Sequence, residues 1–227
     1  MQGDIFATKG IEYLITVVYL LLLAGLAWGG TRRSARAPAR RAPRRIPWFS
    51  VPDGFAFHQG HAWAAAADAG GGDVKVGLDD FAAQLLGAPD GLELPGVGAA
   101  LLEGARAWTV RAGGRELPML SPVEGEVVAV NPAALATPRL AAEDPYGRGW
   151  LLQVRVRDRA GWRHNLLSGT LARSWMRLAA DRLRELLPQG LGLGETMADG
   201  GAPVRGFGRA LNESQWEAVE RDFFLVA

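Results

Sequence analysis

The alternation of hydrophobic and polar positions is most regular between residues 106 and 131. Apolar residues recur at every second position on both sides of Gly113-Gly114, which predicts two β-strands joined by a tight turn. Two consecutive glycines suit a type I′ turn, because both central residues of that turn need a positive φ. The positions expected to face inward are Trp108, Val110, Met119, Val123, Val127 and Val130.

After residue 157 the period of the apolar residues changes to three and four, which predicts helices. The first helix is expected from Asn165 to Leu187. Leu167 leads into its apolar face, which contains Leu171, Trp175, Leu178, Arg182 and Leu186. A second helix is expected to begin at Asn212, where Asn-Glu-Ser-Gln is close to a capping box. Its apolar side contains Trp216, Val219, Phe223 and Phe224. Helices this rich in aromatic residues either cover the β-domain or dock on a partner protein.

The N-terminal region contains a long apolar run, Ile11–Trp28. A helix of that length spans roughly 27 Å, close to the hydrocarbon thickness of a bilayer. We therefore expect a transmembrane anchor, which includes Ile11, Tyr19, Leu22 and Trp28. A cleaved signal peptide fits less well, because its basic residues should precede the apolar run. A buried soluble helix also fits less well, since no other predicted element is apolar enough to surround it.

Seven arginines directly follow this run, between residues 32 and 45. The positive-inside rule then places the N-terminus outside a bacterial inner membrane and the remaining chain in the cytoplasm. Three prolines in the same segment predict an extended linker. We thus expect four regions: a single-pass anchor at 1–30, a linker at 31–47, a β-domain at 48–158 and a helical extension at 159–227.

Composition excludes several classes of function. The formal net charge is +1, so no global field indicates a nucleic-acid partner. The absence of cysteine excludes disulfides, thiolate metal sites and a cysteine nucleophile. His58 and His61 have an H-x-x-H spacing, but they lie in a predicted loop and strand without an evident third ligand, so no metal site is expected. No nucleophile elbow, Walker loop or dinucleotide fingerprint is present.

Five motifs between residues 57 and 157 occur in the order that resembles the glycine cleavage system H protein, a lipoyl-carrier family. They are His61-Ala62-Trp63, Val74–Gly87, Leu92–Gly98, Ser121–Val128 and Glu143–Trp150, the last lacking only the leading Asn of the family's N-E-D-P-Y-G-x-G-W loop. The resemblance implies a mainly β fold, a flattened β-sandwich (barrel-sandwich hybrid) with peripheral helices. The transmembrane helix and the C-terminal helical extension would be additions to that fold.

In this family a lysine at the hairpin tip carries lipoate. Ungapped pairing from either side places Gly114 at that position, whereas a local match to S-V-K-A places Arg111 there. Neither residue has the primary amine that a lipoyl amide requires. The chain has two lysines, Lys9 and Lys75. The resemblance therefore implies a membrane-anchored, divergent member without the lipoyl lysine, and we expect no bound cofactor.

Three hypotheses about function follow. The first is a non-catalytic interaction or assembly subunit in a bacterial membrane respiratory or redox complex, whose partners are other subunits and the lipid bilayer rather than nucleic acid or a small-molecule substrate. The second is a functional lipoyl carrier of glycine cleavage or a related pathway, which would require modification of Lys75. The third, an enzyme, has the least support. The residues considered for partner contact are Arg111, Arg115, Glu116, Trp175, Trp216, Phe223 and Phe224.

The acidic pairs Asp79-Asp80 and Glu143-Asp144 are interpreted as capping and loop-ordering residues. General acid–base catalysis needs two carboxylates that converge on a cleft, and adjacent residues tend to point apart. Asp79 is expected to cap a short helix that Gly87 closes.

Overall fold

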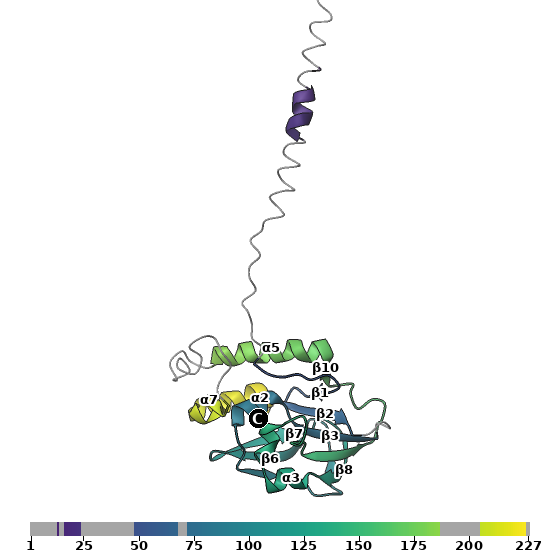
Figure 1. Cartoon of the computed structure of the whole chain (residues 1–227), viewed down its shortest axis with the longest axis vertical. Helices are drawn as coiled ribbons and strands as arrows, with labels where there is room; N and C mark the ends of the chain where they lie inside the picture. Colours follow the sequence, from purple (N-terminus) through teal and green to yellow (C-terminus); the bar gives the residue numbers. More distant parts are fainter. Residues whose placement is uncertain (1–12, 14–15, 24–47, 68–71, 187–204, 226–227) are drawn as a thin grey trace, which may run out of the picture. The chain divides into compact units, whose positions relative to one another are not determined.

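The computed structural model describes residue 13 and residues 16–23, 48–67, 72–186 and 205–225 (Figure 1). The chain forms two units, Met1–Arg45 and Ile46–Ala227. In the first unit, Tyr13 and residues 16–23 are helical and exposed. Among the described residues, no helix combines the length and the apolar character needed to cross a membrane. Ile11, Trp28 and the predicted linker at 31–47 lie outside the described residues, so the anchor stays a prediction.

The second unit is built on two antiparallel sheets. In spatial order, the seven-stranded sheet contains β10 (Leu167–Ser168), β1 (Ala56–Phe57), β2 (Ala62–Ala66), β3 (Asp73–Leu78), β9 (Leu152–Val156), β8 (Gly125–Val130) and β5 (Ala100–Leu101). The three-stranded sheet contains β4 (Gly91–Glu93), β6 (Arg106–Ala112) and β7 (Arg115–Leu120). The mainly β class predicted from the sequence is confirmed.

Helices surround these sheets. They are α2 (Asp80–Leu86), α3 (Pro132–Ala136), α4 (Leu140–Glu143), α5 (Gly169–Leu186), the 3-10 helix η1 (Phe207–Ala210), α7 (Glu213–Val219) and the π-helix η2 (Glu220–Phe224). Figure 1 shows α5, α2 and α7 on one side of the strands and α3 on the opposite side. The hairpin β6–β7 lies beside the strands of the larger sheet in this view.

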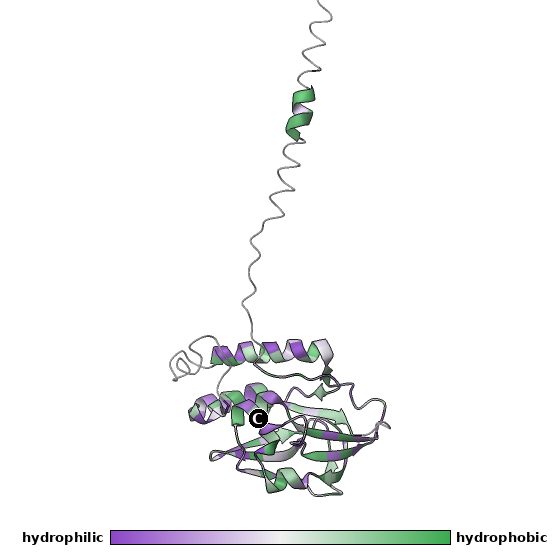
Figure 2. Cartoon of the chain, in the orientation of Figure 1, coloured by the Kyte–Doolittle hydropathy of each residue, from purple (hydrophilic) through white to green (hydrophobic). Residues whose placement is uncertain are grey.

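Alternating residues of the strands form the core, as the period of two requires. Trp108, Val110, Met119, Val123 and Val127 are buried as predicted for the hairpin and the strand after it, whereas Val130, also predicted to face inward, is only partly buried. Figure 2 shows hydrophobic residues along the strands and both hydrophobic and hydrophilic residues on α5.

The first helix of this unit, α2, begins and ends as its sequence predicts. The Asp79 carboxylate accepts a hydrogen bond from the Ala82 amide at 3.0 Å, and Gly87 closes the helix with a φ of 73°. A second contact was not foreseen, because the other carboxylate oxygen of Asp79 lies 2.7 Å from Nδ1 of His61. This pair is buried and joins the start of β2 to the start of α2.

The apolar face predicted for α5 is wrong in part: Trp175 and Leu186 pack against the core, but Leu171, Leu178 and Arg182 are exposed. Its buried face consists of Ala172, Met176, Ala179, Ala180 and Leu183, whereas Leu171 and Leu178 are 62% and 67% exposed. The prediction followed the largest apolar side chains, but small alanines allow closer approach to the layer below. The helix also starts later than predicted, since Leu167–Ser168 pairs with β1 as β10.

The C-terminal segment 205–225 packs into the same core as the sheets. Asn212 caps α7 and forms the predicted capping box with Gln215. Trp216, Val219, Phe223 and Phe224 are each at most 4% exposed. Of the two roles considered for this segment, covering the β-domain is the one observed.

Candidate functional site

The hairpin tip has the geometry that its two glycines predict. Ala112 pairs with Arg115, so Gly113 and Gly114 alone form the turn. Their φ angles are 59° and 79°, both in the left-handed region that a type I′ turn requires and that glycine adopts without strain.

The two glycines nevertheless have different surroundings. A Cβ atom added to Gly113 would lie 2.9 Å from Nε of Arg209, whereas one added to Gly114 would meet no atom within 4 Å. The Gly113 amide donates to the Asp90 carboxylate at 2.5 Å, and Arg209 donates to the Ala88 carbonyl at 3.0 Å. One side of the tip is therefore covered by the C-terminal segment, and the other side is open.

Arg115 connects the hairpin to that segment. Its guanidinium lies 4.7 Å from the centre of the Trp216 ring, donates to the Leu211 carbonyl and lies 3.7 Å from the Glu213 carboxylate. The side chain is only 19% exposed. A partly buried arginine that stacks on tryptophan and satisfies a backbone acceptor stabilises this contact.

Arg111 lies on the exposed side of the smaller sheet. Its guanidinium donates to Glu116 at 2.9 Å and also binds Glu93 on β4. Because Arg111 and Glu116 are directly paired across β6 and β7, the three side chains form a charged row over all three strands. Arg111 is half exposed, and its ion pairs hold it against the sheet.

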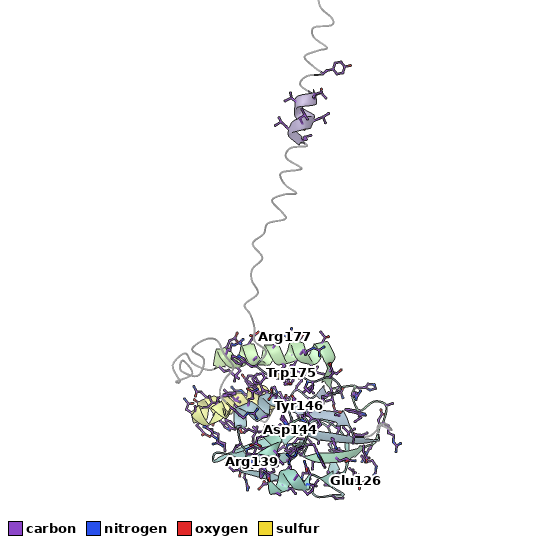
Figure 3. All side chains as sticks on the ribbon, in the orientation of Figure 1. Glu126, Arg139, Asp144, Tyr146, Trp175 and Arg177 are labelled. Carbon is purple, nitrogen blue, oxygen red and sulfur yellow. The ribbon has the colours of Figure 1, made fainter. Side chains whose placement is uncertain are left out.

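The aromatic residues considered for partner contact face the interior. Trp216, Phe223 and Phe224 are buried. Trp175 is partly buried and stacks on the His61 imidazole at 4.8 Å, with Phe81 on the imidazole at 3.9 Å. Figure 3 shows Trp175 on the side of α5 that faces the β-domain. These side chains hold the extension in place rather than present a free surface.

The two histidines of the H-x-x-H spacing have separate partners. His61 binds Asp79, whereas Nδ1 of His58 accepts from the Gly60 amide at 3.0 Å. Burial lowers the pKa of His58. Within the described ranges, no group of three or more histidines and carboxylates has the arrangement of a metal site.

The acidic pairs stabilise the local backbone through hydrogen bonds. Asp80 accepts from the Ser50 amide at 2.7 Å and from Gln84, and its burial raises the pKa of the carboxyl. Asp144 accepts from the Arg148 amide at 2.8 Å. Burial also raises the pKa of Tyr146, whose hydroxyl donates to the Ser50 carbonyl and accepts from the Asp80 amide.

Lys75 lies in the middle of β3, between strands β2 and β9. It pairs with Ala65 on one side and with Gln153 on the other. Its Nζ lies 5.0 Å from the centre of the Trp150 ring. The amine thus belongs to a residue within a strand of the larger sheet.

Sequence reasoning missed Asp90, Arg209 and Leu211 as residues at the tip. Asp90 lies just before β4, where a short polar side chain that captures an amide is a common feature of turns. Arg209 and Leu211 are nearly 100 residues from the hairpin, and no local pattern relates them to it.

Comparison with known proteins adds the family. The model of the glycine cleavage H-protein family matches residues 55–177. The glycine cleavage system H protein of Synechococcus sp. (strain CC9605) is 40% identical over 112 residues, which are 49% of this chain and 84% of that protein. The H protein of Thermobifida fusca (strain YX) is 38% identical over 109 residues, 48% of this chain and 84% of that protein.

Among solved structures, the crystal structure of an H protein from Mycobacterium marinum matches with a TM-score of 0.49 and 28% identity. The match covers 57% of this chain and 99% of the other. The family model covers both sheets, α2 and the first half of α5, and it ends before the C-terminal segment at 205–225. Because the family model matches more than half of the chain, the chain belongs to the glycine cleavage H-protein family.

Proposed function

We propose that this chain uses the H-protein fold as a non-lipoylated, non-catalytic interaction subunit. The observation that carries the proposal is the chemistry of the hairpin tip. Gly113 and Gly114 form the whole turn, and the residues on either side are Ala112 and Arg115. A lipoyl group is attached through an amide to a primary amine, and none of these side chains has one.

The contacts of the hairpin also favour a structural role. A carrier arm needs a tip that enters the active sites of other proteins. Here Arg209 packs on Gly113 and Arg115 binds Leu211 and Trp216, so part of the tip is occupied by the chain itself. The open side at Gly114 and the charged row of Glu93, Arg111 and Glu116 are the parts of the hairpin left for a partner.

Intact mass of the protein purified from its native source tests this proposal. The expected mass is that of the unmodified polypeptide, with or without N-terminal processing. A species heavier by one lipoyl group would contradict it. The Gly114→Lys variant, incubated with a lipoate–protein ligase, is the matched control, because it places an amine at the open side of the tip.

The second candidate is a lipoyl carrier, and membership of the family favours it. The matched relatives are named glycine cleavage system H proteins. This function would need lipoylation of Lys75 or Lys9. Lys75 lies within β3 and contacts Trp150, so it is not on a hairpin tip of the kind that a lipoate–protein ligase modifies. Peptide mapping after the mass measurement would locate an adduct and identify which lysine carries it.

The proposal includes membrane attachment through Ile11–Trp28, with the folded unit on the cytoplasmic side and other membrane-complex subunits as partners. Its support is the apolar run followed by seven arginines. A freely diffusing shuttle between enzymes would not need such an anchor, whereas an assembly subunit would. Extraction in mild detergent followed by native mass determination should recover a complex, and recovery of only a 24.3 kDa monomer would contradict this part.

A further inference from the structure

The start of the C-terminal segment 205–225 is fitted closely to helix α2. A Cβ atom added to Gly87, which ends α2, would lie 2.8 Å from Cα of Gly206, and one added to Gly208 would lie 2.7 Å from the carbonyl oxygen of Leu85. Two backbones can approach this closely only where glycine leaves out the side chain. The segment therefore has a fixed position where it passes the hairpin.

The same segment closes one side of the hairpin tip. Arg209 lies against Gly113, where an added Cβ atom would be 2.9 Å from the Arg209 Nε. From the hairpin, Arg115 stacks on the Trp216 ring at 4.7 Å. Contacts in both directions thus join the segment to the Gly113 side of the turn, whereas a Cβ atom added to Gly114 would meet no atom within 4 Å.

The far end of the segment is anchored in the core. Phe223 and Phe224 are 4% and 0% exposed, and the Phe224 carbonyl oxygen lies 3.3 Å from the position of a Cβ atom added to Gly60. The segment is thus held at both ends, at α2 and at the loop before β2. Arg209 lies between these ends and is exposed. Removal of its side chain should therefore trim the contact with the tip and leave the segment in place.

We propose that the C-terminal segment makes an autoinhibitory contact: it occupies the Gly113 side of the hairpin tip and prevents a second protein from enclosing the turn. A cleft that takes in a two-residue turn has to surround it, so atoms fixed on one side of the turn would clash with the wall of the cleft. This steric barrier does not depend on the missing amine, and it therefore goes beyond the proposed function. A partner that binds only the Gly114 side and the charged row would not meet the barrier.

The experiment uses the full-length chain with an amine placed at the tip. Gly114→Lys supplies the amine, and peptide mapping distinguishes it from the two native lysines, Lys9 and Lys75. This variant is compared with the double variant Gly114→Lys, Arg209→Ala, in which the contact is trimmed. The double variant Gly114→Lys, Arg177→Ala is the matched control, because it removes one positive charge from an exposed arginine of α5 instead.

Two reagents of different size measure access to residue 114. The large probe is a lipoate–protein ligase with lipoate and ATP, which has to bind around the tip, and the small probe is an acetylating ester. Removal of the Arg209 side chain should raise the rate of ligation about tenfold, because its clash with the ligase is relieved. The rate of acetylation should be the same in all three proteins, and Arg177→Ala should leave the rate of ligation unchanged.

Equal rates of ligation with and without the Arg209 side chain would overturn the proposal, whether both rates are high or both are undetectable. The same increase in the Arg177→Ala control would also overturn it, since net charge would then control the reaction. A parallel increase in acetylation would do so as well, because the turn itself would have changed. None of these results bears on the proposed function, which the intact mass of the native protein decides.

Discussion

The C-terminal segment 205–225 follows the part of the chain that the family model matches, whereas the first half of helix α5 lies within it. The two regions differ in how they place their apolar residues. The C-terminal segment buries the large apolar residues of its helices, including Trp216 and Phe224, and leaves Leu225 at its end 49% exposed. Helix α5 packs on the core through three alanines, Met176 and Leu183, and leaves Leu171 and Leu178 exposed. The first arrangement is that of a segment that completes the fold, whereas the second leaves two leucines exposed.

The largest expected effect separates these two roles. Phe224→Ala removes a fully buried ring that contacts His61 and Phe81, so it should lower the free energy of unfolding by about 3–5 kcal/mol. Leu178→Ala, at an exposed position, should change it by less than about 0.5 kcal/mol. Chemical denaturation followed by tryptophan fluorescence measures both. Similar losses for the two variants would remove the distinction.

A smaller effect is expected where the segment joins the hairpin. Arg115→Ala loses the stacking on Trp216 and leaves the Leu211 carbonyl without this donor, so about 1–3 kcal/mol of stability should be lost. Arg177→Ala is the control, because Arg177 is exposed and has no described ion pair. Thermal unfolding of the two variants gives the comparison, and an unchanged midpoint for Arg115→Ala would show that the contact does not stabilise the fold.

Next in size is the difference between the two glycines of the turn. Alanine at either position should cost about 1 kcal/mol for a residue held at positive φ. At Gly113 the new methyl group would also displace Arg209, so Gly113→Ala should be the more destabilising change. Equal losses in urea denaturation would mean that Arg209 moves aside without cost.

The smallest predicted effect is a dependence on pH. Burial raises the pKa of Asp80, so the folded state binds this proton more tightly than the unfolded state does. Stability contributed by this group therefore falls as pH rises from its ordinary pKa of 3.8 through the folded value. Asp80→Asn removes that decline while its amide oxygen can still accept from Ser50. Relative to wild type, the variant should gain stability towards neutral pH, and a constant difference across the range would contradict the assignment.

Local chemistry allowed much of the fold to be predicted from sequence. The Gly-Gly turn, the Asp79 cap and the capping box at Asn212 each depend on neighbours within a few residues, so their patterns are specific. The mainly β class was predicted from strand periodicity and from the H-protein motifs that occur in order along the chain. The β-sheets and the membership of the family are both confirmed.

The features that were not predicted depend on contacts between residues that are far apart in the sequence. The face of α5 was assigned to the largest apolar residues, but the layer beneath accepts small ones. The contact of Arg209 with Gly113 joins positions far apart in the chain, and the bond between His61 and Asp79 is of the same kind. The lipoyl position, the anchor and the membrane partner stay predictions, and the measurements above decide them.

The position of the His61 imidazole also affects how the folded unit unfolds. It lies against Phe81, Trp175 and both terminal phenylalanines, while its Nδ1 binds the carboxylate that starts α2. This ring, at the start of β2, thus contacts α2, α5 and η2 at the same time. Detachment of the C-terminal segment would expose this ring and weaken the start of α2 at the same time. The folded unit should therefore unfold in one cooperative step, without an intermediate in which only this segment is detached.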